Sequence, residues 1–235
     1  MTKGLDISSC FVRSWTLYKS DFGLIFFATL LIIVSSSAAS GFPYIGPVVG
    51  LGLNGVLFGG LYAFYLKLIR GQKAELTDAF DGFRVALWPL VLGGFLTGLL
   101  VTAAVLIAGI PMLFTVVPMA IKFAHNPDLA PDILLTAIGA GTILNIFFCV
   151  VVASLLYAFW IFTLPLIIDK RMEVWPAMEE SRKMVMNNFG AIIGMLGIGI
   201  LLTIVGVLAC CIGLFFTLPV FFGAIAYAYE DLFGQ

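Results

Sequence analysis

The sequence has little charge, and the charge it has is confined to short blocks. Charged residues make up 11% of the 235 residues, whereas 62% are hydrophobic, and the formal net charge is −1. A chain of this composition has too little polar surface to cover a water-soluble core. No basic tail or basic run is present, so nothing in the charge pattern points to nucleic acid. The composition therefore excludes an ordinary soluble domain.

Residue patterns that carry catalytic or metal chemistry are also missing. The four cysteines are not spaced as a disulfide framework, and we interpret them as apolar side chains. Neither a glycine-rich phosphate loop nor an HExxH motif occurs. The single histidine, His125, lies near Asp128 and Asp132 in a segment whose Asn, Pro and Asp content a turn explains better than a metal site. We predict no enzyme activity, no catalytic residue, no cofactor and no metal.

Long apolar stretches account for most of the chain. Each is close to the roughly 20 residues that a helix needs to cross a bilayer. About six are present: Phe22–Ala39, Pro47–Leu66, Ala86–Ala108, Gly141–Pro165, Phe189–Ala209 and Ile212–Tyr229. Nothing long enough for a separate soluble domain lies between them. The sequence predicts an all-α, polytopic membrane helical bundle that forms a single integral membrane domain over residues 1–235.

Lys and Arg occupy alternate links between these stretches. Apart from Lys122, they lie in the amino-terminal arm, in residues 67–84 and in residues 170–183. Links of this kind remain in the cytoplasm, so the pattern predicts that both termini are cytoplasmic.

The amino-terminal arm allows a second interpretation. Its basic residues, the apolar stretch that follows and the small residues at Ser35–Ser40 imitate a secretory signal peptide. The arm is long and has a helical pattern of its own, so we expect the first stretch to be retained as a spanning helix.

Residues 111–140 are also ambiguous. A single helix continuing from the third stretch would be nearly twice as long as the membrane is thick, and Pro111 and Pro118 favour a break. We expect Met112–Phe123 and Asp132–Ala140 to form a helical excursion at the outer surface. The alternative is two further spans, which would leave the orientation of the remaining chain unchanged.

The amino-terminal arm, residues 67–84 and residues 170–183 form three blocks that are expected to be cytoplasmic. The blocks have similar amphipathic patterns, and each precedes a pair of spans. When the blocks are compared, Ser14 aligns with Ser181 and Phe80 with Met178. Any short cytoplasmic link tends to be basic and amphipathic, but these alignments favour a repeat. The sequence predicts three cytoplasmic interfacial helices in a triple repeat, with modules 1–68, 69–168 and 169–235.

Three short runs carry a resemblance to a known family. They are Leu66–Gln72 followed by Asp78–Phe83, Leu164–Asp169 followed by Trp175–Ser181, and the closing Ala226–Gly234. With these runs the chain resembles uncharacterised bacterial multi-pass membrane proteins related to the membrane domain of glycerophosphodiester phosphodiesterases. The similarity covers most of the chain except residues 111–140. It implies a membrane domain of the bacterial inner membrane without the phosphodiesterase barrel, and it transfers no activity.

The remaining candidate residues are polar side chains within or beside the spans. Asn54 and Asn145 are the deepest, and such amides more often bond a neighbouring helix than bind a substrate. Seven cations could contact anionic lipid head groups near the cytoplasmic surface: Lys67, Arg70, Arg84, Lys170, Arg171, Arg182 and Lys183. Membrane lipids are therefore the expected partners.

Two functions fit this pattern. The first is a non-catalytic membrane anchor, scaffold or envelope factor, because neither catalytic sets nor intramembrane charges are present. The alternative is a carrier or lipid-handling protein for an apolar or small substrate that passes near Asn54 and Asn145.

Overall fold

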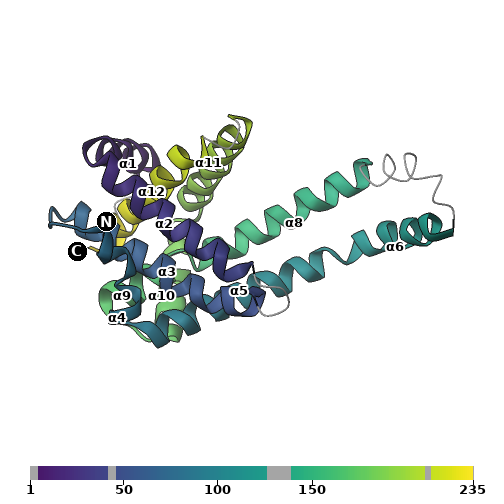
Figure 1. Cartoon of the computed structure of the whole chain (residues 1–235), viewed down its shortest axis with the longest axis horizontal. Coiled ribbons are helices and arrows are strands. Elements are labelled where there is room, and N and C mark those ends of the chain that lie inside the picture. The colour runs from purple at the N-terminus through teal and green to yellow at the C-terminus, as the bar shows by residue number, and fades with distance from the viewer. Residues whose placement is uncertain (1–4, 42–45, 126–138, 210–212, 235) are drawn as a thin grey trace. The chain divides into compact units, whose positions relative to one another are not determined.

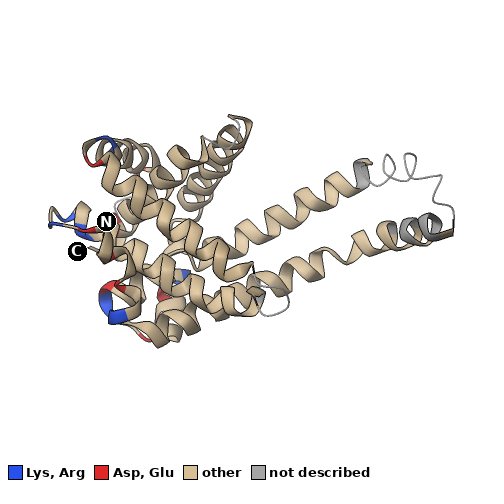
Figure 2. Ribbon diagram, viewed as in Figure 1, with Lys and Arg blue, Asp and Glu red and all other residues tan. Residues whose placement is uncertain are grey.

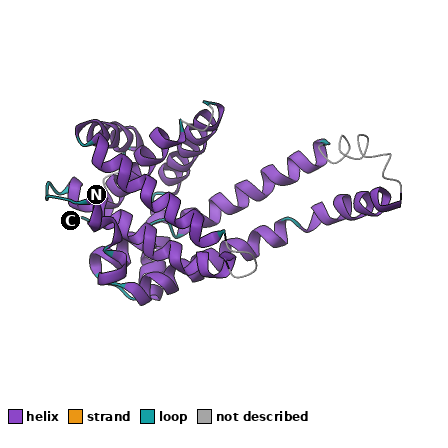
Figure 3. Cartoon of the chain, in the orientation of Figure 1, coloured by secondary structure: helices purple, strands orange, loops and turns teal. Residues whose placement is uncertain are grey.

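The computed structural model describes residues 5–41, 46–125, 139–209 and 213–234. Those residues are almost entirely helical and include no strand (Figure 3). The predicted all-α fold is therefore confirmed. The chain divides into two compact units: unit 1 combines Met1–Gly98 with Ala158–Gln235, and unit 2 is Leu99–Tyr157.

Unit 1 contains most of the helices (Figure 1). They are α1 (Ile7–Ser20), α2 (Phe22–Ser40), α3 (Gly46–Ile69), the short η1 (Leu76–Phe80) and α4 (Gly82–Val85), α9 (Thr163–Lys170), α10 (Val174–Asn187), α11 (Phe189–Leu208) and α12 (Leu214–Phe233). Helix α5 (Leu87–Ala108) begins in unit 1 and ends in unit 2, which also holds α6 (Ile110–His125) and nearly all of α8 (Ala140–Phe159).

Five helical stretches among the described residues are long and apolar enough to cross a membrane, judged by length and composition. They are Phe22–Ser40, Val48–Ile69, Leu87–Phe114, Thr142–Lys170 and Phe189–Leu208. These stretches coincide with five of the predicted spans, and they identify a membrane protein. The sixth predicted span lies in α12, whose end carries Glu230 and Asp231 and which is not among the five.

Helix α3 lies at the centre of unit 1, where it packs against α2, α9 and α12. Its aromatic side chains Tyr62, Phe64 and Tyr65 are fully buried. Glycine permits the closest approaches, since a Cβ on Gly55 would overlap the backbone of α5 at Leu90 and Gly94. Small residues of this kind let membrane helices approach until their backbones touch.

Each of the three blocks packs against a different helix of unit 1. Helix α1 lies on α12, the pair η1–α4 lies on α3, and α10 lies on α9. In the predicted modules, α3, α9 and α12 are each the second membrane helix of a module, and the block covering each one belongs to another module. Each block therefore contacts the second membrane helix of another predicted module.

Two of the three blocks are regular amphipathic helices. On α10, the buried residues are Ala177, Met178, Ser181 and Val185, which recur at helical spacing and form one face.

The second block differs from the predicted single helix. It forms a 3₁₀ turn, η1, followed by the four-residue α4. The reason is the approach to α3: a Cβ on Gly82 would overlap the carbonyl oxygen of Val56, and a Cβ on Gly60 would overlap that of Ala79. The chain bends here to bring its backbone directly against α3.

Unit 2 consists of the end of α5, helix α6 and most of α8. The break that the sequence predicts in this region falls at Gly109, so that Pro111 lies in the first turn of α6, where a missing N–H costs little. Pro118 is accommodated inside α6. The predicted helix at Met112–Phe123 is present within α6, whereas most of the one at Asp132–Ala140 lies outside the described residues.

Candidate functional site

The charged residues of unit 1 gather at the ends of its helices and on the three blocks, on the side where the labels of both chain termini lie (Figure 2). This side contains ion pairs that join segments distant in sequence and a polar cavity. It is the candidate functional site of the molecule.

Arg70, one residue beyond α3, joins the ends of the three central helices. Its Nη1 and Nη2 donate to the two carboxylate oxygens of Asp169 on α9, at 2.6 and 3.0 Å. Its Nη2 and Nε also donate to Glu230 on α12, with a shortest distance of 2.8 Å. Tyr229 adds a hydrogen bond to Asp169 at 2.8 Å. The hydrogen bonds to the two carboxylates raise the pKa of Arg70 above its usual value, so it stays charged.

Lys67 fastens the second block to α3. Its Nζ donates to Asp78 at 2.9 Å and to Asp81 at 2.7 Å. Burial alone would raise the pKa of Asp78, but the hydrogen bonds from Lys67 and from the backbone N–H of Glu75 outweigh burial and lower it. The carboxylate therefore stays ionised and also caps η1 through a reciprocal bond with Glu75.

Arg13 joins α1 to α12 by an ion pair, as Lys67 joins the second block to α3. Its guanidinium forms a bidentate ion pair with Asp231 on α12 and lies over the ring of Tyr227. Cys10 is fully buried beside this pair, with its Sγ 3.7 Å from a carboxylate oxygen of Asp231. Burial, followed by the charge of Asp231, raises the pKa of the Cys10 thiol to about 11, so it is an inert thiol with a polar neighbour rather than a purely apolar side chain.

Two buried serines join blocks to helices at aligned positions of the predicted repeat. Ser14 on α1 donates to the carbonyl of Val220 on α12 at 2.7 Å. Ser181 on α10 donates to the carbonyl of Phe159 at 2.9 Å and accepts from the backbone N–H of Phe162 at 3.2 Å. The Ser14 hydroxyl therefore bonds the helix that its block covers, and the Ser181 hydroxyl bonds the turn between α8 and α9, of which α9 is the helix that its block covers.

A polar cavity of about 250 Å³ lies among the ends of α3 and α9 and the second block. Its charged and polar lining residues are Lys67, Arg70, Gln72, Asp81, Asp169 and Arg171. The rest of the lining is aliphatic.

Arg171 has an unusual backbone. It follows α9 with φ 51° and ψ 35°, and among the described residues it is the one non-glycine residue with positive φ. This left-handed conformation costs roughly 1–2 kcal/mol for a residue with a Cβ. A helix usually ends with glycine or asparagine at this position. An arginine therefore occupies a position where glycine or asparagine would be less strained.

The other cations proposed for head groups have different surroundings. Arg182 and Lys183 pair with Glu179 on the exposed face of α10, at 2.9 and 3.6 Å. Lys170 lies over the ring of Phe233, 5.4 Å from its centre. Among the described residues, Arg84 and Arg171 form no ion pair within 4 Å.

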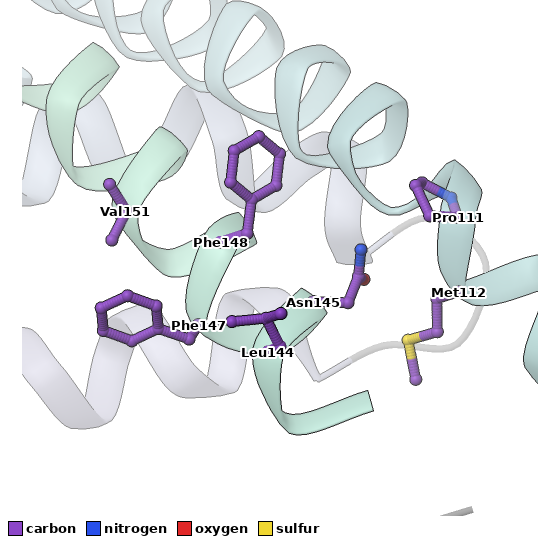
Figure 4. Close-up of a pocket in the computed structure, with 7 residues that line it drawn as sticks. All are labelled: Pro111, Met112, Leu144, Asn145, Phe147, Phe148 and Val151. Atoms are coloured by element: carbon purple, nitrogen blue, oxygen red, sulfur yellow. The ribbon is translucent and has the colours of Figure 1, made fainter. Parts of the chain in front are cut away.

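The two candidate asparagines have different environments. Asn54 on α3 accepts a hydrogen bond from Ser36 on α2 at 2.6 Å, so its amide joins two helices. Asn145 on α8 donates to the carbonyl of Ala108 at 3.3 Å and also lines an apolar cavity of about 580 Å³ within unit 2. In Figure 4 its amide lies between α8 and the start of α6, near Pro111 and Met112.

Of the three candidate metal ligands, only His125 lies among the described residues. Asp128 and Asp132 lie outside them, and the ring of His125 faces the carbonyl of Ile121 in its own helix at 2.8 Å. Among the described residues no group of three or more His, Cys, Asp or Glu could hold a metal ion.

Sequence reasoning identified the cations but missed their acidic partners. Asp169, Glu230 and Asp231 lie in the last turns of α9 and α12, at the same ends as the basic residues, and that shared position is the signal that could have indicated ion pairs. No family model, curated protein or solved structure matches this chain.

Proposed function

We propose that this chain is a non-catalytic scaffold or anchor protein of the bacterial inner membrane, with both termini in the cytoplasm. One observation supports this function above the others: the polar groups of unit 1 bind one another. Arg13, Lys67 and Arg70 are each paired with carboxylates of another segment, which braces the cytoplasmic ends of the helices. Ion pairs that join the helix ends in this way favour a rigid scaffold.

Polar groups deeper in unit 1 are used in the same way. Asn54 is bonded to Ser36, and Tyr65 is bonded to Thr29 and to the carbonyl of Pro219, at 3.1 and 2.9 Å. In membrane bundles such bonds between helices contribute about 0.6 kcal/mol on average. These groups hold the bundle together and are not directed toward a shared ligand.

The proposed orientation follows from the basic blocks and from tryptophan. Each block contributes or adjoins one exposed tryptophan: Trp15 on α1, Trp88 at the start of α5 and Trp175 on α10. Tryptophan is enriched at the head-group level of membranes, and Lys and Arg are enriched on the cytoplasmic side. We infer that the blocks lie in the cytoplasmic head-group layer.

The proposed triple repeat is supported by the contacts of the blocks. The matching roles of Ser14 and Ser181, and the meeting of three second helices at Arg70, are what three parallel modules around one axis would produce. The resemblance to membrane domains related to glycerophosphodiester phosphodiesterases remains part of this proposal.

The scaffold function predicts a bundle that moves nothing. We expect the full chain, reconstituted in liposomes, to give no more flux of fluorescent phospholipid or small solutes than empty liposomes. Reproducible flux that depends on the amount of protein would contradict the proposal.

The orientation has a separate test in a cysteine-free variant with single cysteines introduced. An impermeant thiol reagent should label Gly41→Cys and Asn126→Cys from outside the cell, but not Gln72→Cys or Met172→Cys.

A lipid-handling carrier is the second candidate, and the apolar cavity beside Asn145 is the observation that favours it. An apolar wall with one amide would suit a largely apolar substrate. In that case liposomes should show flux, and Asn145→Leu should reduce it severalfold. Asn54→Leu is the matched control, because the Asn54 amide is bonded to Ser36 instead of lining that cavity.

A further inference from the structure

The polar cavity among α3, α9 and the second block retains unused hydrogen-bonding capacity. Lys67 has three N–H groups and gives two to Asp78 and Asp81. Asp81 accepts from Lys67 through Oδ2, and its Oδ1 accepts no bond from the described residues. Arg171 donates none of its five N–H groups to another described residue. Two residues that line the cavity, Arg171 and Asp81, therefore have a guanidinium and a carboxylate oxygen without a hydrogen-bond partner among the described residues.

The charges around the cavity are mixed. Three cations and two carboxylates line it, and Asp78 and Glu230 also contact Lys67 and Arg70. A simple anion would gain from Arg171 but would also face the carboxylates, and a simple cation would meet the reverse. A ligand that carries both charges can satisfy both groups at once.

The cavity also lies at the level where lipid head groups are expected. Val85 lines it, and the exposed Trp88 follows three residues later. Arg171 lines it, and the exposed Trp175 follows four residues later. Because tryptophan prefers the head-group layer of a membrane, the two sides of the cavity lie beside that layer. A volume of about 250 Å³ is large enough for a head group and too small for a whole lipid.

We propose that this cavity binds a zwitterion of the phosphoethanolamine type, with its phosphate on Arg171 and its primary ammonium on Asp81. The arrangement of Arg171 supports the assignment, because a planar guanidinium matches two phosphate oxygens. None of the lining residues is aromatic, whereas quaternary ammonium groups are usually bound in aromatic cages. The cavity therefore favours a primary ammonium over choline. This site goes beyond the scaffold function and does not depend on it.

The test measures binding of short-chain lipids to the purified full chain in detergent. Calorimetric titration with dihexanoyl-phosphatidylethanolamine should give saturable binding. The phosphatidylcholine and phosphatidylglycerol analogues should bind at least about tenfold more weakly, since choline cannot donate a hydrogen bond to Asp81 and glycerol carries no cation. Soluble phosphoethanolamine and inorganic phosphate are titrated in parallel to separate the sources of the ligand.

The key variant is Arg171→Asn, because asparagine tolerates the left-handed backbone. This variant removes the guanidinium and should keep or raise the melting temperature, so a loss of binding would not reflect unfolding. We expect binding of the phosphatidylethanolamine analogue to weaken at least about tenfold. Arg84→Gln is the matched control: it removes an exposed cation of the second block that does not line the cavity, and should leave binding unchanged.

Each outcome decides one part of the proposal. Binding of the lipid but not of soluble phosphoethanolamine supports a membrane head group, and equal binding of both supports a soluble zwitterion of the same chemistry. Three results would each overturn the proposal. They are equal affinity for all three lipids, an affinity for inorganic phosphate equal to that for the phosphatidylethanolamine analogue, and unchanged affinity in Arg171→Asn. Binding is measured without transport, so the site and the scaffold function can fail independently.

Discussion

Units 1 and 2 differ in the contacts that their helices make with one another. In unit 1, ion pairs join α1, α3, α9 and α12 at their ends, and buried hydroxyls bond backbone groups of neighbouring helices. The described part of unit 2 instead has large apolar side chains that are mostly exposed, including Ile107, Phe114 and Leu144. In a bilayer such side chains are solvated by lipid, which gives no hydrophobic reason for them to pack together.

The difference shows what specifies contacts between membrane helices. Where apolar packing gives little preference for protein over lipid, close backbone approach and polar contacts decide which helices meet. Unit 1 has both, at Gly82 and at Arg70. In the described part of unit 2, Asn145 on α8 bonds the carbonyl of Ala108 on α5, beside an apolar cavity. Substitutions should therefore affect stability far more in unit 1.

The largest effect is expected at the glycine contact between the second block and α3. Gly82→Val places a branched side chain against the carbonyl of Val56 and should destabilise unit 1 by about 3 kcal/mol or more. Thermal unfolding in detergent, followed by circular dichroism, would measure the loss. Gly190→Ala is the control, since nothing lies within 4 Å of its added Cβ. Similar melting temperatures for both variants would contradict the close approach.

A smaller loss is expected when the cluster at the helix ends is broken. Arg70→Met leaves Asp169 and Glu230 facing each other without their cation and should cost about 1–2 kcal/mol, a figure that allows for the one-third exposure of the Arg70 side chain. Adding Asp169→Asn should recover part of the loss. Lys183→Gln, which removes an exposed pair with Glu179, should leave the melting temperature unchanged. An equal effect of Arg70→Met and Lys183→Gln would remove the distinction between the cluster and ordinary surface pairs.

The pH dependence of stability tests the ion pair between Lys67 and Asp78 that joins the second block to α3. The pKa of Asp78 is lowered in the folded chain, so its contribution is present above the ordinary aspartate pKa of about 4 and is lost as the pH falls through the lowered value. Melting temperatures measured from neutral to acidic pH should fall less steeply in Asp78→Asn than in the wild-type chain. Asp6→Asn serves as a control at an exposed cap of α1. Parallel curves for Asp78→Asn and the wild type would show that Asp78 is not fastened in this way.

The smallest effect is expected in unit 2. Asn145→Leu removes the bond of 3.3 Å to Ala108 and a weak bond of 3.8 Å from the Cys149 thiol within α8, and it adds an apolar side chain to an apolar cavity, so the loss should be about 0.5 kcal/mol. Asn54→Leu, which breaks a shorter bond between α2 and α3, should cost more. Scanning fluorimetry of both variants in the same detergent would rank them. The reverse order would mean that unit 2 depends on polar contacts as much as unit 1 does.

Much of the fold could be predicted because the bilayer imposes simple requirements on a helix. Five apolar stretches were placed within a few residues of the helices that contain them, and the buried face of α10 matches its periodicity. The break in the second block was not predicted, because its cause is the carbonyl of Val56, about 26 positions earlier in the sequence. Periodicity reports a pattern within one segment and contains no information on distant backbone.

The candidate site was predicted only in part for the same reason. The sequence identified Lys67, Arg70 and Arg171 as cations beside spans but could not separate them. The folded chain pairs the first two with carboxylates up to 160 residues away and leaves the third with a left-handed backbone at the edge of a cavity.

By itself, the sequence determined the medium of this protein and the approximate extent of its spans, because both depend on composition along a continuous segment. Only the tertiary structure decided which block covers which helix, which charges are neutralised and where a polar cavity remains. Those properties depend on distances between segments, and distances of a few ångströms decide whether a lysine or arginine is a brace or a binding group.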